Sequence, residues 1–403
     1  MTPHPGFARA PIGASLAFVA LAGLGLAPVI AGAATPPYPI RPTGAPFPGS
    51  GLEPLTARQA GMAMAEYWLG DDAYTNPAGA LGERGVTLTP VFQHTNRQDL
   101  AAIYRQFDEQ SGSFDLASAQ ARGAWRGIGL AAYWAQPILR DENQAYIVGD
   151  ITQAPSIRDV DFSMQEQRLG LAAATSRPVG GGTLALGLAG EWYQRQDHYD
   201  YTVDTDGFPL DPSSVELKGD SWAGQFGARW DGWNDASGTS RLRVGAGLRY
   251  AGKLPLDATQ TLGPLSGDTT IVTHVRTNEV ADFGASARAI VSTGVSVSAS
   301  LGRRGSQDYG ELGGVVGPGA LWSTAVAYHD PRDPWGVWFG LGQDQMNGNP
   351  EPRASLLGLG FDVRWKESTL GIGATRKSLA SDVEPDGPRW YAYSVLASLD
   401  VRF

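Results

Sequence analysis

The sequence predicts an all-β fold, a transmembrane antiparallel β-barrel of about 14 strands with an N-terminal hatch or plug segment. From residue 84 onward, apolar and polar or small residues alternate in segments close to the roughly 9–11 residues of a tilted membrane-spanning strand. Aromatic residues lie near the segment ends, as in barrels with an aromatic girdle at each membrane interface. Short and long connections alternate, which is expected of periplasmic turns and outer loops.

A soluble β-sandwich is the alternative, because its strands also alternate between an apolar and a polar face. The segment 241–250 shows the alternation clearly: Leu242, Val244 and Leu248 share one face, and Arg243 and Arg249 share the other. A closed barrel pairs every backbone group within lipid, which an open sheet cannot do. Together with the strand lengths, the aromatic residues and the loop asymmetry, this favours the barrel.

The strands are expected at 84–95, 114–123, 126–135, 163–177, 183–195, 217–231, 240–254, 268–291, 295–305, 319–330, 335–344, 354–365, 369–378 and 389–403. An even number of strands places the first and the last strand ends of the chain on the periplasmic side. The assignment is weakest over 96–125, and the strand 268–291 needs a bulge near Asn278. Girdle aromatics are expected at Trp192, Tyr193, Tyr250, Trp335, Trp365 and 390–393.

Residues 1–33 have the features of a cleaved secretory signal peptide. A weakly basic start precedes an apolar stretch, and Ala31-Gly32-Ala33 fits the small-x-small cleavage pattern. A membrane anchor is the alternative, but no stop-transfer flank follows. No later stretch approaches the ~20 apolar residues of a spanning helix. We therefore expect export to the outer membrane of a Gram-negative cell.

The composition excludes several classes of function. The net charge of −10 argues against a nucleic-acid partner. The absence of cysteine excludes disulfides, thiol chemistry and cysteine-ligated zinc. We expect neither a metal nor a cofactor.

Residues 34–80 are expected to form a Pro-rich lead and a hatch, and residues 81–403 the barrel. A short helix is predicted over 56–69. The stretch 71–79 ends the hatch at a rigid corner, because Pro77 fixes its own φ and restricts Asn76, while Gly79 tolerates positive φ.

The segment 60–81 resembles the end of the N-terminal hatch in the FadL/TodX outer-membrane transporters. Asp71-Asp72-Ala73 followed by Asn76-Pro77-Ala78 matches the pattern that precedes the first strand of that family. Residues 168–190 and 217–250 resemble two of its barrel hairpins. The hatch glycines of the family are partly replaced here by Ala63 and Ala65, and the Pro-rich lead is longer.

The resemblance implies a fourteen-stranded barrel plugged by its N-terminal segment. It also implies that hydrophobic molecules are captured from outside and released through the barrel wall after the hatch moves. Asn76, Pro77 and Ala78 would then form the hatch motif, or simply a turn before a strand. Candidate ligand-lining residues are Met62, Met64, Tyr67, Trp68 and Leu69, which could instead only pack the plug.

Charged residues on the inward face of the predicted strands are expected to line the lumen. They could hold an anionic headgroup, or form a solvated network that fixes the plug. The principal ones are Arg241, Arg243, Arg249, Arg288, Asp362 and Arg364, with Glu191, Asp400 and Arg402 beside them.

Two further sites are weak. The acidic loop 197–207 does not fit the EF-hand ligand frame, because Thr202 and Ser213 occupy ligand positions. No Gly-x-Ser-x-Gly or His-Glu-x-x-His motif is present. A triad around His329, Asp330 and Asp333 is the only catalytic arrangement the pattern suggests, so we expect no enzyme.

The sequence therefore predicts an outer-membrane transporter of hydrophobic compounds, such as long-chain fatty acids or aromatic hydrocarbons. A general diffusion porin for small polar solutes is the alternative, and a barrel enzyme or adhesin is the third possibility. The expected partners are a hydrophobic small molecule, outer-membrane lipid, and the barrel-assembly machinery through the last strand, which ends at Phe403. The chain is expected to be a monomer.

Overall fold

The computed structural model describes residues 53–98, 110–144, 156–205, 208–234, 240–262, 269–308, 315–316, 318–330, 332–346, 353–380 and 389–403. The expected signal peptide (1–33) and most of the Pro-rich lead lie outside these residues. No helix in the described ranges is long and apolar enough to cross a membrane.

The described chain is almost entirely strand. The long strands are β1 (Gly85–Gln98), β2 (Gln110–Trp125), β3 (Ile128–Gln144), β4 (Ser156–Val179), β5 (Gly182–Thr205), β6 (Phe208–Asn234), β7 (Ser240–Ala251), β10 (Val280–Ser292), β11 (Val295–Arg304), β14 (Gly319–Tyr328), β15 (Trp335–Met346), β16 (Arg353–Trp365), β17 (Ser368–Ala380) and β18 (Arg389–Arg402). The short strands are β8 (Pro255–Thr261), β9 (Thr270–Arg276), β12 (Gln307–Asp308) and β13 (Val315–Val316).

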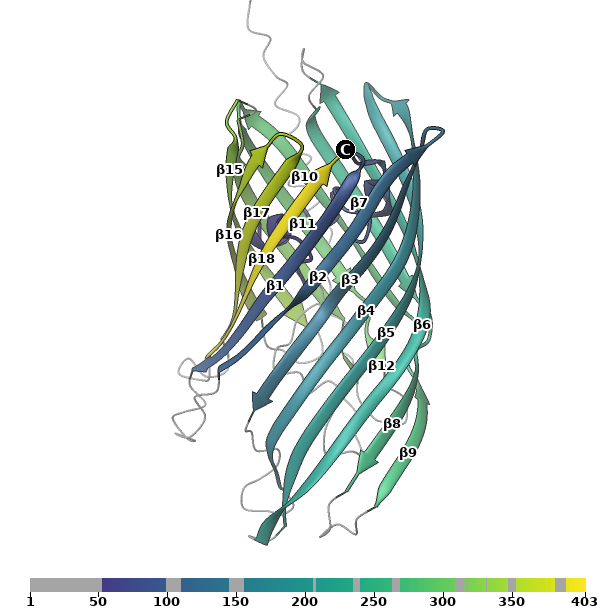
Figure 1. Ribbon diagram of the computed structural model, residues 1–403, viewed down its shortest axis with the longest axis vertical. Helices are drawn as coiled ribbons and strands as arrows, with labels where there is room; N and C mark the ends of the chain where they lie inside the picture. The colour runs from purple at the N-terminus through teal and green to yellow at the C-terminus, as the bar shows by residue number, and fades with distance from the viewer. Residues whose placement is uncertain are drawn as a thin grey trace, which may run out of the picture.

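Fourteen strands close an antiparallel barrel, because β1 pairs with β18 and β5 pairs with β6. The other long strands pair in chain order, with β7 beside β10 and β11 beside β14 because the short strands lie between them in sequence (Figure 1). The predicted fold class and strand number are confirmed. Tight turns such as 126–127, 180–181, 293–294 and 366–367 gather at the end where β18 finishes, at the top of Figure 1. We call this the short-turn end and the opposite one the long-loop end.

Two adjacent strands are interrupted. β8 follows β7 along β6 after a break at 252–254, and β9 pairs with β8 before a break at 277–279 leads into β10. A bulge near Asn278 was predicted within a single strand 268–291, but the structure divides that segment into β9 and β10. The prediction of a long loop at 255–267 was wrong, because β8 occupies the first half of this segment.

The outward and inward faces follow the predicted alternation. Apolar side chains such as Leu171, Leu188 and Phe226 are exposed on the outer face. Exposed tryptophans mark the short-turn end at Trp125, Trp335 and Trp365, and the Trp192–Trp222 pair lies further along β5 and β6. Tyr193 was wrongly expected in the girdle. It is buried in the lumen, and its hydroxyl donates to the Gly252 carbonyl at 2.9 Å.

Strands β3 to β6 are longer than predicted. β5 runs to Thr205 and β6 begins at Phe208, where the sequence indicated a loop over 196–216. Beyond Trp192 the outward residues of β5 become polar, at Gln194, Gln196 and His198. The lipid-facing pattern ends there although the strand continues.

Residues 53–84 lie inside the barrel, and we call this segment the hatch. They contain one turn of α-helix, α2 (Ala57–Gly61), and one 3₁₀ helix, η1 (Pro77–Leu81). The helix predicted over 56–69 is therefore wrong beyond residue 61. Ala63 and Met64 adopt positive φ, 47° and 70°, which is incompatible with continuing a right-handed helix.

Candidate transport site

Asn76 fixes the hatch at its centre. Its side-chain nitrogen donates towards the carbonyls of Trp68, Ala228 and Ala246 at 2.9 to 3.1 Å. Its side-chain oxygen accepts the Ala78 amide at 3.0 Å and so caps η1. Ala228 and Ala246 face each other in β6 and β7. One fully buried side chain thus joins two hatch segments to two barrel strands.

Glycines in the wall let the hatch backbone approach closely. A methyl group at Gly245 would overlap the Trp68 carbonyl, and one at Gly340 would overlap the Met62 carbonyl. At Gly187 it would overlap the backbone of Pro77 and Ala78. The hatch is therefore packed against β5, β7 and β15 with no space for solute between backbone and wall.

Arginines from the wall neutralise the acidic residues of the hatch. Glu66 pairs with Arg58 at 2.6 Å and with Arg288 at 3.4 Å, and Asp71 pairs with Arg243 at 2.6 Å. Burial alone would raise the pKa of Asp71, but Arg243 and Arg288 hold it well below its usual range. These contacts join α2 and the hatch corner to β7 and β10.

A cavity of about 500 Å³ lies between this acidic side of the hatch and the short-turn end. Its lining is dominated by charged residues from both the hatch and the wall, and most of its arginines are on the wall. The charged lining residues are Arg58, Glu66, Asp71, Asp72, Glu83, Arg122, Arg229, Arg243, Arg288, Asp362, Arg364, Asp400 and Arg402. We call this cavity the polar vestibule.

The pKa of Asp72, which also lines the vestibule, is shifted in the opposite direction to that of Asp71. Burial raises its pKa to about 6, although the Arg122 guanidinium opposes the rise. Its carboxylate accepts from Gln59 of α2 at 3.2 Å and from Gln120 of β2 at 3.1 Å. It therefore connects the first hatch segment to the wall.

A compensated layer of charge lies on the long-loop side of the hatch. Glu191 is fully buried and accepts from Tyr133 at 2.9 Å and Arg249 at 2.7 Å. Arg168–Glu166 and Arg195–Asp197 form similar pairs at 2.7 and 3.0 Å. Each of these buried arginines faces an acid, so the layer offers no excess of either charge.

The barrel wall divides between β2 and β3. Their pairing runs from Trp125–Ile128 to Ser118–Ala135 and ends there. Beyond this point β2 continues on β1 as far as Gln110, and β3 continues on β4 as far as Gln144. Figure 1 shows the two strands diverging towards the long-loop end. We call the branch point the fork.

Local sequence explains the fork. In β2, Ala117 has no partner on β1, because Thr89 pairs with Ser118 and Pro90 with Leu116. In β3, Gln136 and Pro137 lie opposite a single residue of β4. Such bulges turn strands away from each other, and Pro137 has no N–H with which to continue a ladder.

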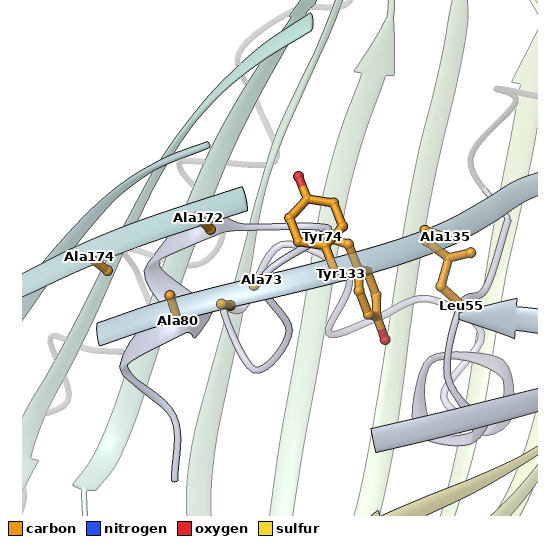
Figure 2. Close-up of a cluster of buried hydrophobic side chains, with 9 residues drawn as sticks. Leu55, Ala73, Tyr74, Ala80, Tyr133, Ala135, Ala172 and Ala174 are labelled. Carbon is orange, nitrogen blue, oxygen red and sulfur yellow. The ribbon is translucent and has the colours of Figure 1, made fainter. Parts of the chain in front are cut away.

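An apolar cluster covers the fork from the lumen. Tyr74 of the hatch packs edge-on against Tyr133, with ring centroids 6.2 Å apart. Leu55 lies beside Ala135, and its carbonyl accepts from Ser118 at 2.6 Å (Figure 2). The cluster contains Leu55, Ala73, Tyr74, Ala80, Ala131, Tyr133, Ala135, Ala172 and Ala174. Apolar side chains of the hatch and the wall thus close the fork on the lumen side.

The residues predicted to line a ligand pocket are all buried, none more than 3% exposed: Met62, Met64, Tyr67, Trp68 and Leu69. Tyr67 and Trp68 pack with Leu321 and Leu356 of the wall, and none of the five lines the vestibule. The sequence interpretation missed Leu55, Tyr74 and Tyr133, which lie at the fork. Leu55 and Tyr74 belong to the predicted hatch, but nothing in the sequence shows which wall strands they meet.

The predicted lumen charges do not form one cluster. Arg249 belongs to the compensated layer, and Arg243 and Arg288 bind the hatch. Arg241 is exposed near the short-turn end. Asp362 lies 3.5 Å from His329, whose ring also meets Arg364 at 3.1 Å. His329 is therefore next to Asp362 rather than engaged with Asp330, which pairs with Arg332.

No protein-family model matches the chain, and no curated protein does so either. Solved structures do match it. A Pseudomonas aeruginosa FadL homologue superposes with a TM-score of 0.58 at 13% identity, covering 86% of this chain and 98% of that one. The Ralstonia pickettii toluene transporter TbuX gives 0.56 at 11% identity, covering 87% and 99%. The Pseudomonas putida toluene transporter TodX gives 0.55 at 12% identity, covering 87% and 98%. The chain has the fold of the FadL/TodX-type outer-membrane channels.

Proposed function

We propose that the protein transports hydrophobic compounds across the outer membrane, in at the long-loop end and out through the fork in the barrel wall. The observation that carries the proposal is the position of the fork. It opens beside the apolar cluster of Leu55, Tyr74 and Tyr133, on the long-loop side of a hatch whose other side is the polar vestibule.

The physical argument concerns where an apolar solute can go. Passing the hatch would bring it into a vestibule lined by arginines and carboxylates, where its transfer from the lumen is unfavourable. The outer face beside the fork carries exposed Phe114 and Leu169, which indicates that the wall there faces lipid. Lateral release through the fork avoids the vestibule, after the solute has passed the layer of paired charges on the long-loop side of the hatch.

The five candidate ligand-lining residues lie away from the fork and would take part in transport only after the hatch moves. Met62, Met64, Tyr67 and Trp68 pack on wall strands opposite the fork, and Leu69 is fully buried. Their movement with the hatch would expose apolar area inside the lumen. Fatty acids and aromatic hydrocarbons are both compatible with such a surface.

We place the short-turn end in the periplasm and expect a monomer assembled through the strand that ends at Phe403.

Ion conductance separates this function from a general porin. The hatch packs against wall glycines and is bound by ion pairs, so the intact protein in a planar bilayer should show no steady open channel. Weakening the hatch by Arg243→Ala and Arg288→Ala should produce current. A large steady conductance from the unaltered protein would favour the porin hypothesis and contradict the hypothesis of a plugged transporter.

A further inference from the structure

The fork contains a buried hydrogen-bond donor without a partner. The side-chain nitrogen of Gln136 makes no hydrogen bond, and the residue is only 5% exposed. A buried amide N–H without an acceptor is unfavourable and rare in folded proteins. Its position is informative, because Gln136 directly follows Ala135, the last residue of β3 that pairs with β2.

The bulge accounts for the burial of this side chain. Ala131, Tyr133 and Ala135 are the inward residues of β3, so regular alternation would point residue 136 at lipid. The extra residue in β3 opposite β4 breaks that alternation, and Gln136 and Pro137 are both buried. The amide is therefore held at the branch of the wall, beside the apolar cluster that contains Ala135.

Three other buried donors without partners lie where a solute does not fit, and a fourth, on Arg122, lies at the polar vestibule rather than at the fork. The indole nitrogen of Trp68 packs so closely on Gly284 that a methyl group there would overlap it. Trp338 packs in the same way on Gly360. Arg249 has one free nitrogen, but its guanidinium is already bound by Glu191 and lies near Asp282. Gln136, in contrast, lies at the fork.

The charge around the path decides the kind of acceptor. The nearest buried arginines of the lumen, Arg168 and Arg249, are paired with Glu166 and Glu191. A carboxylate at the fork would therefore lose its hydration without gaining a free cation. A neutral oxygen loses less on desolvation and can accept the single amide hydrogen bond.

We infer that the substrates are uncharged hydrophobic molecules that carry one oxygen acceptor, such as ketones, phenols or esters, and that Gln136 binds that oxygen during release. The inference rests on the proposed transport through the fork. A pure hydrocarbon would leave the amide unpaired and so gain less. Gln136 is thus a specificity-determining residue of the exit, in addition to the apolar surface that any such substrate shares.

The test uses two probes of the same carbon skeleton, octylbenzene and octanophenone, and the fatty acid decanoate. Binding of each radiolabelled probe is measured on the full-length protein in lipid nanodiscs, and uptake is measured in cells that express it. The variants are Gln136→Leu and Gln136→Met, which keep the size of the side chain without the donor. Gln194→Leu, a half-buried glutamine on the outward side of β5, is the control.

The unaltered protein should prefer octanophenone to octylbenzene by about three- to tenfold, the value of one hydrogen bond. Both Gln136 variants should lose that preference while octylbenzene binding stays the same, and Gln194→Leu should keep it. An unchanged ratio in the Gln136 variants, or tighter binding of decanoate than of octanophenone, overturns the inference. If uptake of every probe is absent while the binding ratio responds to Gln136, the donor site stands and the proposed transport fails.

Discussion

Asn76 is the residue whose loss should reveal what the hatch contributes. Asn76→Ala leaves the Ala78 amide and the Trp68 carbonyl without this partner inside the barrel. The cost should be roughly 2–4 kcal/mol of hatch stability. Limited proteolysis should cut within residues 57–80 much faster than in the unaltered protein.

Pro77→Ala is the matched comparison, because it removes only a φ restraint and should cost about 0.5–1 kcal/mol. Both variants should keep a folded barrel, shown by heat-modifiable migration on a gel. Loss of the barrel in Asn76→Ala would mean that this side chain is needed for barrel assembly and is not specific to the hatch.

Asp72 gives the hatch a defined dependence on pH. Its folded-state pKa of about 6 lies above the usual value of a carboxyl group, so the folded hatch binds this proton more tightly than the unfolded chain does. Stability therefore rises as the pH falls from 7 towards 4, by roughly 1–3 kcal/mol. Hydrogen exchange of the hatch amides, corrected for the intrinsic rate, should be slower at pH 5 than at pH 7.

Asp72→Asn should abolish most of that difference, since the amide does not titrate. Asp71→Asn should reduce the difference without abolishing it, because the pKa of Asp71 lies below this pH range but its charge helps to raise the pKa of Asp72. A hatch that exchanges faster at pH 5 than at pH 7 would contradict the assignment.

At the residue scale, the sequence predicted where the hatch motif lies in the chain, but not which wall residues it contacts. The hatch motif Asn76-Pro77-Ala78 could be placed because the residues are adjacent and precede the first strand. Its contacts with Ala228 and Ala246 could not, since they depend on which wall strands face the hatch. The same holds for Gln136, whose burial follows from a bulge that alternation does not show.

At the scale of elements, α2 and β17 offer a direct test of hatch movement. A β-carbon at Gly371 would lie 3.5 Å from that of Ala57, which suits a disulfide. The chain has no cysteine of its own, so Ala57→Cys with Gly371→Cys introduces a single possible bridge. Oxidation should lock α2 to the wall and reduce uptake of hydrophobic probes at least tenfold, and reduction should restore it.

Each single cysteine variant is the control, and neither should respond to oxidant. Full uptake by the oxidised double variant would show that α2 need not move. In that case the apolar cluster at the fork would have to open without it.

Periodicity predicted all fourteen barrel strands because each lipid-crossing segment carries its own alternation. It failed where strands leave the membrane: in β5 the outward positions become Gln194, Gln196 and His198, and the contrast between the two faces disappears. The helix predicted over 56–69 stopped at Gly61, because the Ala63 and Met64 backbones turn to positive φ in contact with the wall. The fork was not foreseen, because pairing between strands is a non-local property.

At the scale of the whole molecule, polarity changes along the barrel axis in a way that favours lateral exit. The short-turn end holds the polar vestibule, the centre holds a hatch packed on glycines, and the long-loop side holds a compensated charge layer beside the apolar fork. A hydrophobic solute that passed the hatch would enter the vestibule, whose lining is charged. The wall between β2 and β3 is the route that avoids it.

The position of a bound substrate analogue tests this account most directly. A crystal structure of the protein soaked with a brominated alkyl phenyl ketone would locate the bromine by its anomalous signal. The account predicts bromine at the fork, within contact distance of Leu55, Ala117 and Ala135. Bromine in the polar vestibule, beside Arg58 and Asp71, would contradict release through the wall.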